Sequence, residues 1–148
     1  MTFLAALLII SVTGCSCVLS KGVPDSLSSI AYIIPKWLFS TWIMVTGMML
    51  MPALMDVLSP CYQWMGFLMV VGLSCVAASP YYRTEQVRLH YIGAVLCFIF
   101  AMLVVWMTRP VLLWLWLAYP ILLMPRTRMW LVMSAEWICL SELVLAII

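Results

Sequence analysis

The sequence predicts an all-α fold, a polytopic transmembrane bundle of six helices. The first observation is composition: the 148 residues are 68% hydrophobic and only 8% charged, against roughly 45–50% and about 25% in soluble domains. The second is that charged and turn-forming residues divide the chain into apolar runs, most of them near the ~20 residues that a spanning helix needs. Because a small soluble domain leaves much of its surface in water, we expect one transmembrane domain with short loops.

The apolar runs define the expected helices. They cover residues 2–19, 37–58, 62–79, 90–108, 111–124 and 129–148. The fifth run is short, because its 14 residues rise only about 21 Å at about 1.5 Å each, less than the roughly 30 Å hydrocarbon core. A chain of five helices, in which this run does not form one, is the alternative.

The first run has a second interpretation. Val12-Thr13-Gly14-Cys15 resembles a bacterial lipoprotein cleavage box, which would place a lipid on Cys15. A signal peptide ordinarily opens with basic residues, and no Lys or Arg precedes this run. We therefore expect a retained first helix.

The basic residues predict an orientation. The loops after the first, third and fifth runs hold six of the seven Lys and Arg, whereas the other two loops hold only Arg109. The six are Lys21, Lys36, Arg83, Arg88, Arg126 and Arg128. Since Lys and Arg accumulate in short cytoplasmic loops, we expect a bacterial inner-membrane protein with both termini outside the cytoplasm. The net charge of +2 gives no reason to expect nucleic acid as a partner.

Two carboxylates lie in the last run, Glu136 and Glu142. A carboxylate inside a membrane is costly, so such residues usually face protein, water or a partner. At 3.6 residues per turn the two lie about 120° apart and do not form one acid pair. Glu142 is expected to reach interfacial water. Glu136 is expected to make a structural hydrogen bond or to be protonated in place. An ion or proton pathway is the alternative role for both.

The connection between the first two runs is the richest polar segment. Pro24 favours a turn, and Asp25 or Ser26 is expected to cap a short helix that leads to Pro35. Recognition of a head group or a partner by Pro24, Asp25, Ser26, Ser28 and His90 is the alternative.

Small residues recur every four positions in the fourth run, at Gly93, Cys97 and Ala101. This spacing lets two helix backbones approach closely. Packing within the chain is the expected role, and contact between copies of the chain is the alternative.

No cofactor is expected. His90 is the single histidine, whereas metal sites need several ligands and a bis-histidine haem needs two. The sequence contains no phosphate loop, nucleophile elbow or paired catalytic carboxylates. No metal is therefore predicted, and no residue set argues for an enzyme.

Short motifs in the first three quarters of the chain resemble a known family. They are Gly22-x-Pro24-x-Ser26-x-Ser28, Ser79-Pro80 and His90-Tyr91-Ile92-Gly93-Ala94. They resemble the DRAM and Frag-type six-helix membrane proteins and their short bacterial relatives of unknown function, over roughly residues 1–110. The resemblance implies the six-helix architecture. It carries over Pro24, Ser26, Ser28, His90 and Gly93. It implies no defined activity, and the short fifth run departs from the family pattern.

Three functions follow as expectations. The first is a non-enzymatic membrane protein that packs with membrane lipids, with another membrane protein or with its own copies. The second is a small oligomeric channel or transporter that uses Glu136. The third is a lipid-modifying membrane enzyme that uses His90 and Asp25.

Overall fold

The predicted fold class, an all-α helical bundle, is confirmed. The structure is a computed structural model that describes residues 2–22, 24, 26–82, 86–117 and 131–148. Within these ranges the chain forms helices and turns and no strand. Four stretches are long and apolar enough to cross a membrane. They are Thr2–Leu19, Lys36–Val57, Pro60–Tyr81 and Val87–Thr108.

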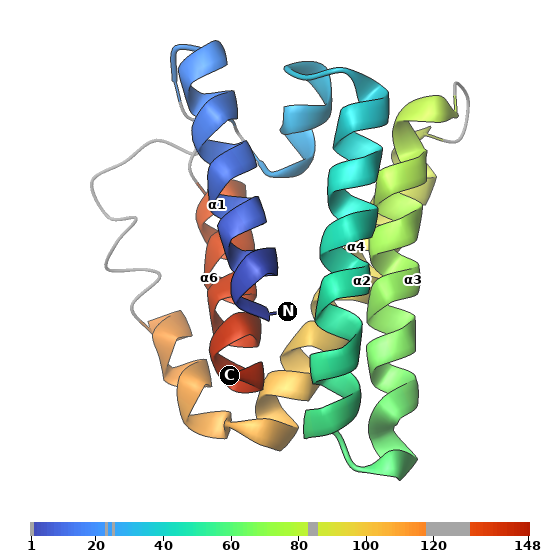
Figure 1. The fold of residues 1–148 in the computed structure, drawn as a ribbon, viewed down its shortest axis with the longest axis vertical. Coiled ribbons are helices and arrows are strands. Elements are labelled where there is room, and N and C mark those ends of the chain that lie inside the picture. Colours follow the sequence, from blue (N-terminus) through green and yellow to red (C-terminus); the bar gives the residue numbers. More distant parts are fainter. Residues whose placement is uncertain (1, 23, 25, 83–85, 118–130) are drawn as a thin grey trace.

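The first four α-helices alternate in direction along the bundle. The α-helices are α1 (Thr2–Leu19), α2 (Lys36–Val57), α3 (Gln63–Ala78), α4 (Gln86–Thr108) and α6 (Leu131–Ile147). Short 3-10 helices lie at η1 (Ser28–Tyr32), η2 (Pro60–Tyr62), η3 (Ser79–Tyr81) and η4 (Pro110–Trp114). In Figure 1, α1 and α3 run upward, whereas α2, α4 and α6 run downward. We call the end that holds η1 the upper end of the bundle.

The helix bounds differ from the apolar runs most clearly in two places. The α4 helix begins at Gln86, four residues before the apolar run that opens at His90, because a helix can continue past the hydrocarbon on polar residues. The fifth run begins as the 3-10 helix η4 and is helical over 115–117. Residues 118–124 of that run lie outside the described residues, as do 129–130 of the sixth.

Prolines fix several of the element boundaries. Pro60, Pro80 and Pro110 each stand at the start of a 3-10 turn. Proline has a fixed φ and no N–H to donate, so it fits the first turn of a helix and interrupts a helix that precedes it. The turns between spans therefore fall where the sequence places proline.

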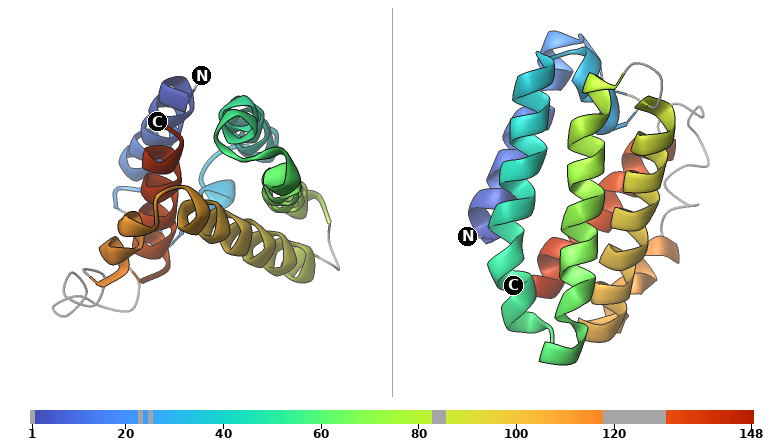
Figure 2. Two further views of the ribbon diagram at one scale, coloured as in Figure 1. Left: turned by 90° about the horizontal axis from the view of Figure 1, so that it is seen from below. Right: turned by 90° about the vertical axis from the view of Figure 1, so that its right-hand side faces the viewer.

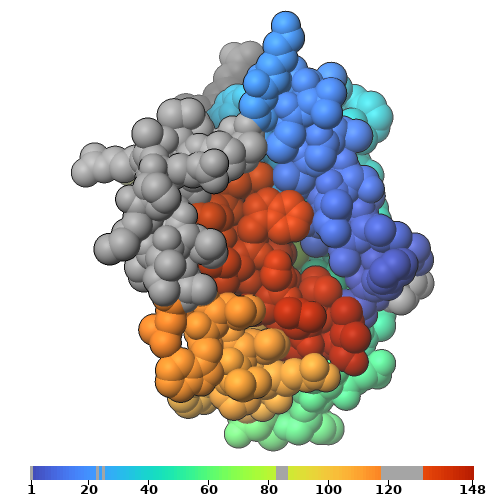
Figure 3. Space-filling view, turned by 90° about the vertical axis from the view of Figure 1, so that its left-hand side faces the viewer, coloured from blue at the N-terminus to red at the C-terminus, as the bar shows by residue number. Residues whose placement is uncertain are grey.

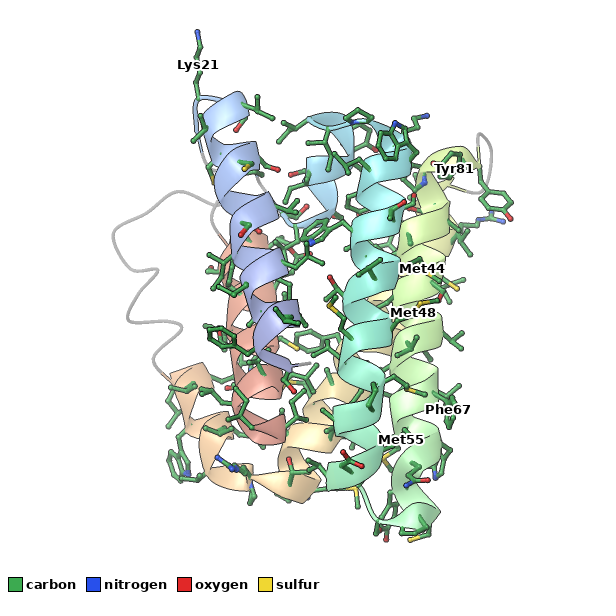
Figure 4. The ribbon with its side chains drawn as sticks, in the orientation of Figure 1. Lys21, Met44, Met48, Met55, Phe67 and Tyr81 are labelled. Carbon is green, nitrogen blue, oxygen red and sulfur yellow. The ribbon has the colours of Figure 1, made fainter. Side chains whose placement is uncertain are left out.

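The α1 helix ends in a Schellman motif. Lys21 adopts the left-handed conformation with φ of 53°. The Gly22 N–H donates to the Cys17 carbonyl at 3.1 Å, and the Lys21 N–H donates to Val18 at 3.3 Å. This pairing satisfies carbonyls that a helix end leaves open. Lys21 then points away from the bundle at its upper end (Figure 4).

Most hydroxyl groups in the spans are satisfied within their own helix. The hydroxyls of Thr13, Thr46 and Ser74 each donate to the carbonyl four residues earlier, at 2.8–2.9 Å. Such bonds suit a helix in lipid, where no water is present to pair a polar group. Ser40 also bonds between helices, donating to the Ala77 carbonyl of α3 at 2.6 Å.

The helices form two groups around a space. The α3 helix packs closely with both α2 and α4, and α6 packs mainly on α4. Figure 2, seen from below, shows α1 and α6 on one side and α2 and α3 on the other, with α4 closing a third side. Two clusters of buried residues result. The upper core comprises Ile9, Ile30, Phe39, Trp42 and Val76. The lower core includes Leu50, Leu54, Met69, Val104 and Leu143.

The outer surface is strongly apolar. Large hydrophobic side chains are exposed along every described span, among them Phe3, Ile10, Met48, Phe67 and Ile92. Met48 and Phe67 lie along α2 and α3 in Figure 4. An apolar surface of this extent is abnormal in water and normal against lipid. The protein is therefore a membrane-integrated helical bundle.

Candidate functional site: a cavity inside the bundle

A cavity of about 470 Å³ lies inside the bundle, lined mainly by α2, α3, α4 and α6. It exists because α2 and α6 make few close contacts with each other, while each packs on the α3–α4 pair. Its walls come from both cores, with Trp42 and Val76 from the upper core and Leu50 and Leu143 from the lower core. The space therefore runs lengthwise through the bundle.

The polar lining residues gather at the upper end of the cavity. Trp42 of α2, His90 of α4 and Glu136 of α6 all line it. Each lies within about two turns of the start of its helix; α2 starts at the upper end, and α6 starts below it (Figure 1). Ser28 of η1 also lines the cavity. The surface of the cavity is nevertheless almost wholly apolar, so these residues line it mainly with their carbon atoms.

The lower part of the cavity is apolar. Leu50, Met69, Ala101 and Leu143 line it and belong to the lower core. None of them carries a polar side-chain group beyond the weakly interacting thioether of Met69. The lower walls of the cavity are therefore hydrocarbon.

Trp42 contributes a hydrogen-bond donor without a partner. Its side chain is 4% exposed, and its indole N–H has no acceptor among the described residues. The indole packs edge-on against Phe39, with ring centroids 5.9 Å apart. Burial of an unpaired donor is costly. Trp42 borders the cavity, but its indole nitrogen is itself covered by surrounding atoms.

Glu136 ties the first connection to α6. Its Oε2 accepts a hydrogen bond from the Leu27 backbone N–H at 2.5 Å. Leu27 immediately precedes η1, and Ile30 within η1 is fully buried. Figure 1 shows η1 lying between α1 and α2 at the upper end. Glu136 therefore makes a structural hydrogen bond that holds η1 over the upper end of the cavity.

The serines of this connection pair with one another. Ser26 Oγ accepts from the Ser29 N–H at 3.1 Å and lies 2.8 Å from Ser28 Oγ. Ser29 Oγ in turn accepts from the Ser26 N–H at 3.3 Å. Ser26 thus acts at the start of the short 3-10 helix η1. The structure describes the backbone position of Pro24 but not Asp25, so the predicted roles of Asp25 lie outside the described residues.

His90 lies beside the end of α3. Its Nδ1 is 3.5 Å from Ser79 Oγ, the outer limit of a hydrogen bond, while that hydroxyl donates to the Val76 carbonyl at 2.8 Å. Among the described residues, no group of three or more His, Cys, Asp or Glu side chains could hold a metal ion.

Glu142 occupies a different place from the predicted one. We expected it to reach interfacial water, but it is fully buried. Its Oε2 accepts a hydrogen bond from the Trp116 indole N–H at 2.9 Å, and its Oε1 has no partner within the described residues. The prediction was wrong because Trp116, which follows η4, donates to the carboxyl group from a neighbouring segment. Figure 3 shows the described end of this segment, in orange, lying against α6, in red. The spacing along α6 alone could not show this neighbour.

The small residues of α4 face the interior. A Cβ added at Gly93 would lie 2.7 Å from the Gly72 carbonyl oxygen and 2.7 Å from Cys75 Cβ. Cys97 lines the cavity, and Ala101 is 2% exposed. The stripe is therefore used for packing within the chain, chiefly against α3.

Sequence reasoning missed Trp42 and Trp116 as polar contributors. Their positions inside apolar runs, away from the interface where tryptophan is ordinarily enriched, were the available signal.

Comparisons with protein-family models, curated proteins and solved structures found no match. The resemblance to DRAM and Frag-type proteins stays a prediction.

Proposed function

We propose that the protein is a non-enzymatic integral membrane protein that holds the hydrocarbon chain of a lipid in its central cavity. The observation that carries this proposal is the cavity itself. Its volume of about 470 Å³ falls within the ~300–1,000 Å³ typical of small-molecule sites, which are mostly apolar with a few placed polar groups.

The cavity also has an opening suited to a lipid. Val95 and Ile99 of α4 and Val132 of α6 line it, yet each is about half exposed at the surface, at 55%, 48% and 54%. A residue that borders both the interior and the outer surface marks an entrance. Since that surface is apolar, a lipid chain would enter sideways from the bilayer.

The apolar walls favour a lipid over an ion. Ion pathways in membranes are lined by carbonyls, charged side chains or water, whereas Glu136 is already bonded to Leu27 and the lower walls are hydrocarbon. A channel or transporter that uses Glu136 is the weaker alternative for this reason.

Filling the cavity is expected to expel the lipid. Leu140 lines the cavity, whereas Leu145 on the same helix is 45% exposed and does not line it. Leu140→Trp should reduce the lipid retained after purification to about a tenth, because a tenfold loss of affinity corresponds to about 1.4 kcal/mol, within the about 1–3 kcal/mol cost of overpacking. Mass spectrometry of the intact protein from mild detergent measures this.

Leu145→Trp is the matched control and should retain lipid as the unmodified protein does. Equal retention by the two variants, with both folded, would contradict the proposal.

We also propose that the upper end faces the cytoplasm of a bacterial inner membrane. Lys21 and Lys36 adjoin the ends of α1 and α2 at the upper end, whereas Arg109 follows α4 at the lower end. This asymmetry supports an inward-facing upper end and outward-facing termini. A cysteine added at either terminus should react with an impermeant maleimide in intact cells; reaction only after lysis would refute the orientation.

A further inference from the structure

A groove on the outside of the bundle adjoins the central cavity. Its volume is about 340 Å³, and it is lined by hydrophobic side chains of α4 and η4. They are Phe98, Ile99, Met102, Leu103, Trp106 and Leu113. Phe98 and Ile99 also line the cavity. Any apolar outer surface contacts lipid, but this groove is a part of it that leads to the cavity.

The groove and the cavity lie against different faces of α4. Cys97 and Ala101 line the cavity and not the groove, whereas Met102 and Trp106 line the groove and not the cavity. At 3.6 residues per turn, these two pairs lie about 140° apart around the helix. Phe98 falls between them and lines both spaces. A hydrocarbon chain that passes Phe98 therefore moves from the outer face of α4 to its inner face.

The groove begins at the lower end of the bundle. Trp106 lies close to the end of α4 at Thr108 and is 63% exposed. Leu113 belongs to η4, which lies at the lower end (Figure 1). Tryptophan is enriched where a membrane meets water. This end of the groove is therefore at the lower membrane interface, where a lipid carries its head group.

The groove leads from that interface to the depth of the entrance. Ile99, which borders the entrance, and Thr108, which ends α4, are separated by a rise of about 14 Å at about 1.5 Å per residue. That rise is about half of the roughly 30 Å hydrocarbon core, so Ile99 lies near the middle of the bilayer. A head group can therefore stay at the interface while the end of its chain turns past Phe98 into the cavity.

We infer that the bound lipid comes from the leaflet at the lower end, with its head group beside Trp106, its chain along the groove and the end of that chain in the cavity. This inference rests on the proposed function and adds the leaflet and the direction of the lipid. The groove selects the leaflet because it extends from the entrance at Ile99 toward the lower end.

Filling the groove tests this route. Leu103 lines the groove and does not line the cavity, so Leu103→Trp leaves the walls of the cavity unchanged. The variant should retain about a tenth of the lipid that the unmodified protein retains, the loss expected for an overpacked contact. Mass spectrometry of the intact protein from mild detergent measures the retained lipid.

Ile92→Trp is the matched control. Ile92 lies on the same helix, on the upper side of the entrance, is 64% exposed and lines neither space. This variant should retain lipid as the unmodified protein does. Loss of lipid in Ile92→Trp without loss in Leu103→Trp would place the lipid in the upper leaflet and overturn the inference. Equal retention by the two variants would also overturn it.

The position of the head group is tested on the unmodified protein, so this result does not depend on the folding of a variant. A phosphatidylethanolamine with a photoactivatable group beside its head group, bound to the protein in detergent, should label Trp106 and Leu113. Labelling of Tyr91 or Ile92 in their place, or of no residue at the lower end, would contradict the inferred direction.

The inference and the proposed function fail in different ways. Loss of lipid in Leu140→Trp but not in Leu103→Trp would overturn the groove route and leave the cavity as the site of a lipid chain. Full retention by both variants would overturn both proposals.

Discussion

Replacement of Gly72 by alanine is expected to destabilise the bundle by about 1–3 kcal/mol, the range of overpacked cores. A Cβ at this position would lie 2.6 Å from the Cys97 backbone nitrogen and 2.7 Å from the Gly93 carbonyl oxygen. Both atoms belong to the α4 backbone, so no side-chain rotation can relieve the clash. The α3 and α4 helices would have to separate, and the cavity wall to which Cys97 contributes would move with them.

The chain offers matched controls for this substitution. A Cβ at Gly14 of α1 would meet nothing within 4 Å, and one at Gly47 of α2 would meet the flexible Leu73 side chain at 3.4 Å. Gly14→Ala should therefore cause no loss of stability, because alanine favours a helix by up to about 1 kcal/mol over glycine. Unfolding in detergent micelles, followed by helicity, measures all three. Stability of Gly72→Ala equal to that of Gly14→Ala would refute the close α3–α4 contact.

Replacement of Glu142 by methionine is expected to destabilise the protein by about 1–2 kcal/mol, because the hydrogen bond between its buried carboxyl group and the Trp116 indole N–H is lost. The carboxyl group is fully buried and accepts this bond at 2.9 Å. Glu142→Gln should cost less, since the amide keeps an oxygen acceptor of similar shape.

A double-mutant cycle isolates the pair. Trp116→Phe alone would remove the hydrogen bond that Glu142 Oε2 accepts from the indole. The double variant Trp116→Phe with Glu142→Met removes donor and acceptor together, so it should be more stable than the two single effects predict. We expect a coupling of about 0.6–2 kcal/mol, the range for hydrogen bonds between membrane helices. Strictly additive effects would show that the Trp116–Glu142 bond contributes nothing.

Much of the fold could be predicted from the sequence because lipid imposes simple rules. A span must be apolar and long, and its backbone must be paired within the helix. The α1 run was therefore located to the residue, at Thr2–Leu19. The start of α4 was misplaced because helix formation at Gln86 does not depend on hydrophobicity.

The candidate site was only partly predictable. Glu136 stood out because a carboxylate in a membrane needs a partner, and a structural hydrogen bond or protonation in place was the expected role. Its partner is a backbone N–H, at Leu27, which leaves no mark in a sequence. The cavity was also unpredictable, because it depends on how far apart α2 and α6 lie. The position of Trp42 beside the cavity likewise follows only from how the helices pack.

The central claim is that a lipid chain occupies the interior of the bundle, and cross-linking in the membrane tests it most directly. A lipid with a photoactivatable group near the end of its acyl chain should label Leu50 and Leu143, which line the cavity but are only 1% and 2% exposed. Lipid outside the bundle cannot reach these side chains. Labelling confined to outward-facing residues such as Ile10 and Phe67 would contradict the claim.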